Sequence, residues 1–254
     1  MNNPEFLRRC LGDVHVATSL LSRLPVPHLV PARFDHSARA VWAYPVAGLI
    51  LALISMAFAV ILMWFSLPFG IAAGGLIGAM MITTGAMHED GLADTCDGFW
   101  GGWDKSRRLE IMKDSHIGTY GVLSLLVVTG LRWTACTALL ATAPLAIVVA
   151  AILSRSVMPG VMAALPHARD TGLSKSVGRP TARVAGAGFA IAAAIAVALL
   201  GGAGFFAAGL AVLAAAATTA LAKAKIDGQT GDVLGATQQL SEVVILLGLV
   251  AVAA

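Results

Sequence analysis

The chain has 254 residues, of which 58% are hydrophobic and only 12% are charged, and its mean hydropathy is +0.83. Soluble domains are usually about half apolar and about a quarter charged. With 17 basic and 14 acidic residues, this chain has too few charges to cover the surface of a soluble fold. The composition excludes a soluble enzyme, a disordered chain and a nucleic-acid binder. It predicts an all-α membrane protein that crosses the bilayer several times.

The first segment of the chain, residues 6–24, mixes apolar residues with charged ones such as Arg8, Arg9 and Asp13. This mixture is typical of an amphipathic helix that lies at the membrane interface. A tilted additional span is the alternative interpretation. The polar start and the early charges are unlike a signal peptide, so we expect the chain to be inserted through its own spans and left uncleaved.

Seven apolar tracts follow, each close to the roughly 20 residues that a helix needs to cross a bilayer. The seven predicted spans are Val41–Phe65, Phe69–Met87, Gly118–Leu140, Pro144–Leu165, Val184–Ala203, Phe205–Ala222 and Val233–Ala254. Membrane barrel strands alternate apolar and polar residues, whereas these tracts are apolar throughout. The sequence therefore predicts a bundle of about seven transmembrane helices in a single domain, residues 1–254.

The charges are distributed on one side of the predicted bundle. The breaks within the three helix pairs, Ser66–Gly70, Ala141–Pro144 and Gly201–Gly204, contain no ionisable side chain. The opposite connections, residues 1–39, 88–116, 167–183 and 223–232, hold 15 of the 17 Lys and Arg residues. The positive-inside rule assigns that side to the cytoplasm. We expect a multi-pass protein of the cytoplasmic membrane whose active site faces the cytoplasm.

Seven of the 14 acidic residues fall in the connection 88–117, which is the predicted active-site segment. If this segment is helical, Asp90, Asp94 and Asp97 lie within one narrow sector of the helix, at positions i, i+4 and i+7. Three carboxylates so close together repel one another unless a cation lies among them. Oxygen ligands of this kind select Mg²⁺, or Mn²⁺, over zinc. The alternative is a solvated acidic segment that keeps a helix end in water.

The same connection carries basic residues and a second acidic turn, with Arg108, Lys113 and Asp114 among them. A metal held by carboxylates beside basic side chains suits a diphosphate, whose negative charge both can share. Positive-inside placement alone also explains basic residues here.

A further polar stretch, residues 227–236, begins the last span and includes Gln229 and Asp232. A polar entry turn is its simpler interpretation.

Arg132 and Arg155 lie inside predicted spans, each about eleven residues from the break that joins them. Charges buried in membrane helices are costly and usually face a polar interior. Snorkelling to the headgroups is the alternative, but this spacing places both residues near mid-bilayer. We expect at least one of them to reach a polar cavity or to pair with an acid such as Glu242.

Six short motifs run in order through nearly the whole chain. They are Ser22–Pro27, Tyr44–Gly48, His88–Gly98, Asp114–Gly121, Ala168–Leu173 and Gln229–Ala236. In these motifs the sequence resembles cobalamin synthases, the adenosylcobinamide-GDP ribazoletransferases of vitamin B12 assembly. The resemblance implies an integral inner-membrane enzyme. Its reaction joins adenosylcobinamide-GDP to α-ribazole, or to α-ribazole 5′-phosphate, and releases GMP.

The resemblance also implies roles for the candidate residues. An in-line attack on a diphosphate needs a bridging cation and a base near the attacking hydroxyl. We expect Asp90, Asp94 and Asp97 to hold Mg²⁺, with Asp97 or Asp114 as the general base. The residues expected to bind the substrate are Arg108, Lys113, Arg155, Gln229 and Asp232.

Two other functions remain open from the sequence. The fragment Asp94-x-x-Asp97-Gly98 is similar to part of the motif of CDP-alcohol phosphotransferases, although Phe99 and Trp100 follow where that motif continues with Ala-Arg. A cation transporter could use the acidic cluster as an ion path. Transporters, however, place ions near the midplane between repeated halves. Here the acids crowd at one membrane face.

Overall fold

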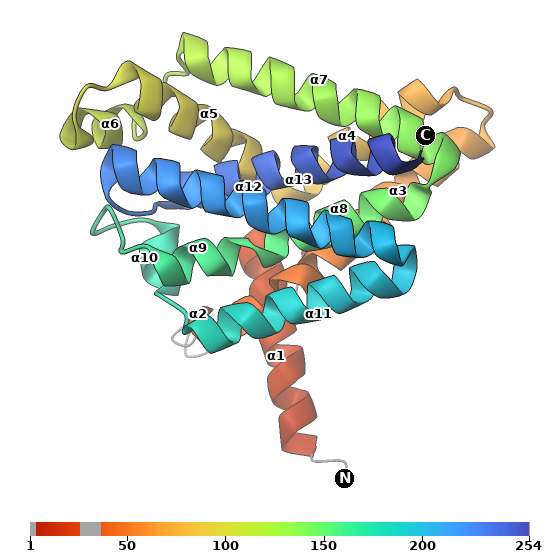
Figure 1. Cartoon of the computed structure of the whole chain (residues 1–254), viewed down its shortest axis with the longest axis horizontal. Coiled ribbons are helices and arrows are strands. Elements are labelled where there is room, and N and C mark those ends of the chain that lie inside the picture. Colours follow the sequence, from red (N-terminus) through yellow and green to blue (C-terminus); the bar gives the residue numbers. More distant parts are fainter. Residues whose placement is uncertain (1–3, 26–36, 254) are drawn as a thin grey trace.

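The computed structural model describes residues 4–25 and 37–253, so the end of the Ser22–Pro27 motif lies outside the described residues (Figure 1). Apart from an isolated bridge between His167 and Gln229, the regular structure in these ranges is helical. The helices are α1 (Pro4–Leu21), α2 (Ser37–Ala40), the 3₁₀ helix η2 (Val41–Ala43), α3 (Tyr44–Trp64), α4 (Phe69–Thr84), α5 (Met87–Gly101), α6 (Lys105–Ile111), α7 (Thr119–Thr142), α8 (Pro144–Ser156), α9 (Met158–Ala164), α10 (Leu173–Val177), α11 (Ala182–Leu200), α12 (Gly202–Ile226) and α13 (Gly231–Ala253). The predicted all-α membrane fold is confirmed.

Six helical segments of the described chain are long and apolar enough to cross a membrane. They are Ser37–Trp64, Thr119–Thr142, Pro144–Ala164, Ala182–Leu200, Gly202–Ile226 and Gly231–Ala253. The remaining predicted span differs from the expectation, because α4 has only 16 residues and α5 follows it at a bend of 87°. The prediction of seven spans therefore holds when this bent pair is counted as one.

The corner between α4 and α5 is built by two residues with left-handed backbone conformations. Gly85 has a φ of 67° and Ala86 a φ of 54°. Glycine adopts this region without a steric cost, whereas alanine does so at some cost in energy. The amide of Arg23, just after α1, donates a hydrogen bond of 2.7 Å to the carbonyl of Thr83 and so supports the end of α4. The corner turns the acidic segment away from the direction of α4.

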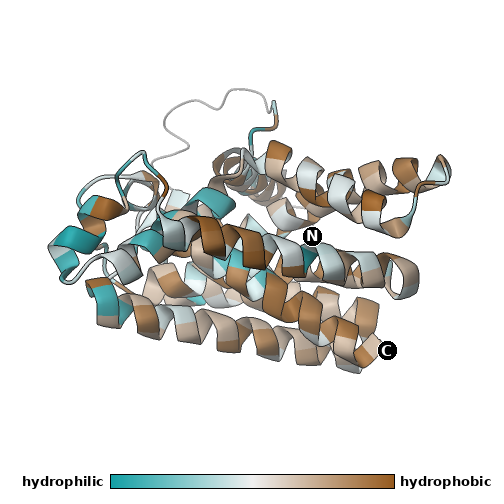
Figure 2. Ribbon diagram, turned by 90° about the horizontal axis from the view of Figure 1, so that it is seen from above, coloured by the Kyte–Doolittle hydropathy of each residue, from teal (hydrophilic) through white to brown (hydrophobic). Residues whose placement is uncertain are grey.

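The polar residues gather at one end of the bundle. Figure 2 shows the hydrophilic parts of the ribbon concentrated at the end where α6 and α10 lie, and mainly hydrophobic ribbon elsewhere. The uncharged turn at Gly201 between α11 and α12 lies at the opposite end (Figure 1). The charged connections that carry α6 and α10 therefore lie at the same end of the bundle.

The N-terminal helix α1 lies across the direction of the long helices, and its first turns project from the bundle (Figure 1). Its side chains Phe6, Leu7 and Leu11 are exposed, as are Arg8 and Arg9. It is not among the helices that are long and apolar enough to span. The structure therefore agrees with an amphipathic helix and not with an extra span.

The centre of the bundle is formed by α8 and α13. Every residue of α8 from Ala146 to Ser156 is buried, and α13 packs against α5, α7, α8 and α12. Small residues allow these helices to approach closely. A Cβ at Gly48 of α3, for example, would lie 2.7 Å from the carbonyl oxygen of Ala151 in α8. This tight core holds the helices that carry the candidate site.

Candidate active site

The first part of the acidic segment is a regular helix, which is the condition under which its three carboxylates share one sector. Helix α5 runs from Met87 to Gly101 and contains Asp90, Asp94 and Asp97. Glu89 and Asp90 fall in its first turn, where negative side chains interact favourably with the helix dipole. Asp90 is exposed, Asp94 is half-buried and Asp97 is buried. The three side chains thus lie on the same helix but differ in their exposure to solvent.

A close contact between α5 and α13 brings a fourth carboxylate to this helix. A Cβ at Gly91 would lie 2.8 Å from the carbonyl oxygen of Asp232, and a Cβ at Gly235 would lie 3.2 Å from the backbone of His88. Because neither position has room for a side chain, the two backbones meet directly. The contact places Asp232 beside Asp90 and Asp94. The negative charges of these carboxylates repel one another.

Asp232 is paired with a cation from the loop between α9 and α10. The guanidinium of Arg169 lies 3.1 Å from a carboxylate oxygen of Asp232. Thr230 caps the start of α13, since its hydroxyl accepts a bond of 3.3 Å from the amide of Val233. The site therefore combines carboxylates on α5 with an Arg–Asp pair at the N-terminus of α13.

The fit of this acidic face to Mg²⁺ rests on its donor set. Mg²⁺ in phosphoryl-transfer sites is commonly held by one or two carboxylates together with substrate phosphates. Asp90 and Asp94 supply two such carboxylates one helical turn apart, and Asp232 lies close to them. Within the described ranges, no group of three potential ligands is already arranged around a common point. The residues fit a site that substrate phosphates complete.

Asp97 has a further structural role. Its two carboxylate oxygens accept hydrogen bonds from the amides of Gly118, at 2.6 Å, and Gly121, at 2.9 Å. These amides belong to the first turn of α7, whose N–H groups have no partners within their own helix. Asp97 therefore joins α5 to the start of α7. Each carboxylate oxygen of Asp97 keeps a second lone pair that a metal ion can use. The role of Asp97 as a metal ligand therefore stays a prediction.

Asp114 lies on an exposed turn after α6. Its carboxylate accepts hydrogen bonds from the His116 ring, at 2.8 Å, and from the His116 amide, at 3.0 Å. These bonds lower the pKa of Asp114 below the ordinary range of aspartate. Asp114 and Asp97 line a cavity of ≈ 320 Å³ beside the start of α7. Asp90 and Asp232, by contrast, line the cavity described below.

The three predicted phosphate-binding cations have different positions. Arg108 donates to the backbone carbonyls of Gly102, at 3.0 Å, and Lys225, at 2.9 Å, and so ties α6 to the end of α12. Lys113 is exposed. Arg155 is buried in the bundle, 3.3 Å from the carboxylate of Glu242. The structure does not bring these three side chains together.

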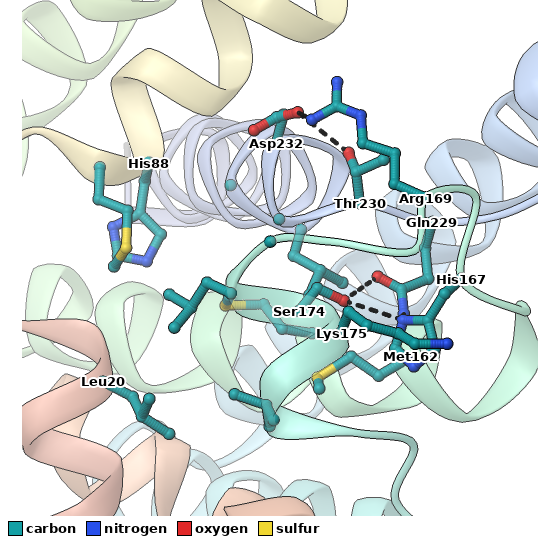
Figure 3. Close-up of a pocket in the computed structure, with 18 of the residues that line it drawn as sticks. Leu20, His88, Met162, His167, Arg169, Ser174, Lys175, Gln229, Thr230 and Asp232 are labelled. Carbon is teal, nitrogen blue, oxygen red and sulfur yellow. Dashed lines mark hydrogen bonds and ion pairs between the residues drawn. The ribbon is translucent and has the colours of Figure 1, made fainter. Parts of the chain in front are cut away.

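A group of polar residues, most of which sequence reasoning left unassigned, surrounds a cavity of ≈ 260 Å³. Along one wall, the Ser174 hydroxyl donates to Gln229 Oε1 at 2.5 Å, and Gln229 Nε2 lies 2.9 Å from His167 Nδ1. Lys175 lines the same wall (Figure 3). Gln229 was predicted to bind the substrate, and the structure places it and Asp232 at this one cavity.

Burial and the positive charges of Lys175 and Arg179 lower the pKa of His167. The imidazole is therefore neutral near pH 7. Its Nδ1 accepts from the Gln229 amide, so its proton resides on Nε2, which becomes a hydrogen-bond donor. The polar wall thus presents uncharged and cationic donors to whatever enters the cavity.

A network of buried polar residues lies beneath the acidic helix. Arg132 of α7 pairs with Glu89 at 3.0 Å and with Glu242 at 2.8 Å, and it also donates to Gln239 at 2.8 Å. Arg155 joins the network through Glu242. The expected pairing of a membrane-embedded arginine with Glu242 is confirmed, and it involves both arginines.

Sequence reasoning assigned no role to His88, His167, Arg169, Ser174 and Lys175, which all line the cavity. Arg169 lay within a motif of the family resemblance, and His88 began another. The sequence feature that could have indicated these residues is their position in the polar connections on the charged face. Their convergence depends on contacts between segments about 60 or more residues apart in the chain, such as that of Gln229 with His167.

Comparison with known proteins identifies relatives along almost the whole chain. Residues 13–250 match the model of the cobalamin-5-phosphate synthase family. Three proteins named adenosylcobinamide-GDP ribazoletransferase are similar to the chain. The protein of Bradyrhizobium diazoefficiens is 42% identical, covering 96% of this chain and 95% of the relative. That of Mesorhizobium japonicum is 42% identical with 94% and 93% covered, and that of Brucella anthropi is 43% identical with 94% and 96% covered. No solved structure matches. The chain therefore belongs to the cobalamin-5-phosphate synthase family.

Proposed function

We propose that this protein is a membrane-bound transferase that joins adenosylcobinamide-GDP to α-ribazole, or to α-ribazole 5′-phosphate, and releases GMP. A hydroxyl of the ribazole attacks the phosphorus on the cobinamide side of the diphosphate. The bond from that phosphorus to the bridging oxygen breaks, and GMP leaves. Membership of the family and the names of the relatives support this reaction.

The observation that carries the proposal is the position of Asp90. This residue belongs to the acidic face of α5 and also lines the cavity, together with Asp232 and Arg169. An acceptor held in the cavity therefore lies next to the carboxylates that would face a diphosphate. Placing two reactants in contact in this way is, with electrostatic stabilisation, a main contribution that a protein makes to a phosphoryl transfer.

We propose that Asp90 and Asp94, with Asp97 as the further candidate, hold Mg²⁺ or Mn²⁺. The bound cation would share the charge of the diphosphate and of the departing GMP. Arg169, which pairs with Asp232, and Lys175, which lies on the wall with Ser174, would bind phosphate oxygens. These two cations are better placed for that role than Arg155, which is occupied by Glu242 inside the bundle.

Asp97 and Asp114 remain the proposed general bases from the sequence. We propose Asp232 as a third candidate, because it lines the cavity of ≈ 260 Å³, whereas Asp97 and Asp114 line the cavity beside the start of α7. We also propose that the charged face of the bundle is cytoplasmic and that the membrane is the cell inner membrane, in keeping with the positive-inside rule. Both substrates would then arrive from the cytoplasm.

The test uses purified protein in liposomes with Mg²⁺, adenosylcobinamide-GDP and α-ribazole. The expected result is release of GMP in proportion to the corrinoid product. A matched reaction replaces the corrinoid donor with a CDP-linked lipid. Folded protein that releases no GMP from the first mixture, or that turns over the lipid instead, contradicts the proposal.

A further inference from the structure

His88 is a buried imidazole without a partner. Its side chain is only 1% exposed, and within the described ranges neither ring nitrogen has a hydrogen-bond partner. Buried polar groups are nearly always paired, and an unpaired one destabilises the folded protein. His88 also lines the cavity of ≈ 260 Å³. A polar group that remains unpaired at the wall of a cavity indicates a partner that arrives with a ligand.

The cavity lining combines polar and apolar side chains. Figure 3 shows His88 on one side and the cluster of Ser174, Gln229 and His167 on the opposite side. The apolar side chains of the lining include Leu20, Leu21, Met158, Met162 and Val177, and the ring of Tyr44 adds further apolar surface. Asp232 and Arg169 lie together at another edge (Figure 3). A ligand that fits this lining has an apolar part and a polar, hydroxyl-bearing part.

The volume limits the apolar part to a small ring system. Sites for drug-sized ligands are about 300–1,000 Å³, and this cavity lies just below that range. A corrin macrocycle is far too large for it. A fused bicyclic base fits. Methionine side chains, here Met158 and Met162, make favourable contacts with the faces and edges of aromatic rings.

Hydrogen-bond chemistry separates the two bases that take part in the proposed reaction. Guanine presents donors and acceptors along several edges, and the apolar side chains of the lining would leave some of them unpaired at a cost for each. A benzimidazole attached to ribose through one ring nitrogen has a single free ring nitrogen, which is an acceptor. Neutral histidine supplies one N–H donor. The N–H of His88 therefore matches the one acceptor of this base.

We propose that this cavity binds the azole base of α-ribazole, with the N–H of His88 donating to the free ring nitrogen. The assignment rests on the proposed function and adds the place and orientation of the acceptor. With the base beside His88, the ribose points toward Asp90 and Asp232, where the attack on the diphosphate takes place. His88 thereby acts as a specificity residue and not as an acid or base.

The test compares two acceptors that differ by one atom, the α-riboside of benzimidazole and the α-riboside of indole, in which the free nitrogen is replaced by C–H. One net hydrogen bond of about 1–1.5 kcal/mol corresponds to roughly a tenfold difference in KM. Wild-type protein should therefore use the benzimidazole riboside with a KM about tenfold lower. The variant His88→Phe, which keeps a flat ring but has no donor, should use both ribosides with similar KM values.

Three other results would overturn the assignment. Wild-type protein that uses both ribosides equally contradicts it without the need for any variant. A His88→Phe protein that still discriminates contradicts the role of His88. The variant Met162→Trp narrows the cavity and should raise the KM for α-ribazole while leaving the KM for adenosylcobinamide-GDP unchanged; the opposite pattern would assign the cavity to guanine. If wild-type protein releases no GMP with α-ribazole at all, the proposed function fails instead.

Discussion

Arg132 on α7 and Glu242 on α13 form an ion pair of 2.8 Å inside the helical bundle, although they are 110 positions apart in the sequence. The same arginine holds Glu89 at 3.0 Å, so the pair also fixes the first turn of the acidic helix α5. Arg132 and Glu242 are 2% and 5% exposed. At this depth an ion pair cannot exchange its partners for water, and its loss affects three helices together.

Replacing Arg132 with methionine should destabilise the protein strongly. Breaking a buried ion pair by removing one partner costs about 3–5 kcal/mol, because the remaining charge stays buried. Thermal unfolding in detergent measures the effect. The control is Arg107→Met, which removes an exposed ion pair with Glu110 of 2.7 Å; exposed pairs contribute little to stability. Equal losses in the two variants would contradict the network as a structural element.

Removing the divalent cation or a carboxylate of the acidic face should abolish turnover. We expect a chelator to stop GMP release and added Mg²⁺ to restore it. We expect Asp94→Asn to lower kcat by about 100-fold or more, since the loss of groups that merely support a metal ligand already costs about 10–100-fold. Glu110→Gln, in the same polar connection but exposed, is the matched control. Full activity of Asp94→Asn would remove this residue from the site.

The variant Asp97→Ala separates two roles of this carboxylate. Loss of its bonds to Gly118 and Gly121 should cost about 1–2 kcal/mol of stability, as for other residues that cap a helix start. Asp104→Ala, which uncaps the short exposed helix α6, should cost less. The Mg²⁺ concentration for half-maximal activity is the second measurement. An unchanged value would mean that Asp97 only joins α5 to α7; an increase would make it a metal ligand too.

The contact of α5 with α13 at Gly91 should not tolerate a methyl group. The Cβ of Gly91→Ala would lie 2.8 Å from the carbonyl oxygen of Asp232, so the helices must separate. Overpacking of this kind costs about 1–3 kcal/mol. GMP release should fall as well, because Asp232 moves away from Asp90. In Gly130→Ala, where the Cβ meets nothing within 4 Å, stability should stay the same or rise. A harmless Gly91→Ala would contradict the close contact.

His167 should make stability depend on pH below neutrality. Its folded-state pKa is lowered by burial and by Lys175 and Arg179, so it lies below the unfolded value of about 6.5. The unfolded state then binds the proton more tightly, and the contribution to stability is complete above pH 6.5 and declines as the pH falls toward the folded pKa. Between pH 7 and pH 5.5 the Tm of wild-type protein should fall more than that of His167→Gln. Parallel curves would disprove this contribution.

Much of the fold was accessible from the sequence because the bilayer restricts the possible structures. Uncharged breaks such as Gly201–Gly204 and the one-sided placement of Lys and Arg predicted the hairpins and their common face. The spacing of Asp90, Asp94 and Asp97 predicted that, on a helix, they would share one sector. These features are local, and a local pattern is sufficient to recognise them.

The rest depends on contacts that no local pattern contains. The short length of α4 follows from a corner at Gly85 and Ala86. The sequence does not reveal this corner, because the apolar tract continues through both residues. Asp97 was grouped with Asp90 and Asp94 by spacing, but the amides of Gly118 and Gly121 give it different neighbours. Likewise, the cavity exists only because α1, α5, the loop before α10 and the start of α13 converge.

The shortness of α4 also has a consequence for the membrane around the protein. Its 16 residues extend about 24 Å, compared with a hydrocarbon thickness of about 30 Å. A helix shorter than the bilayer is accommodated by local thinning. Lipids next to α4 should therefore be compressed, and α5, which turns by 87° at its end, should lie within the headgroup layer. Local thinning of this kind would bring the membrane surface closer to the carboxylates of α5. It would also leave a shallow entrance for bulky substrates.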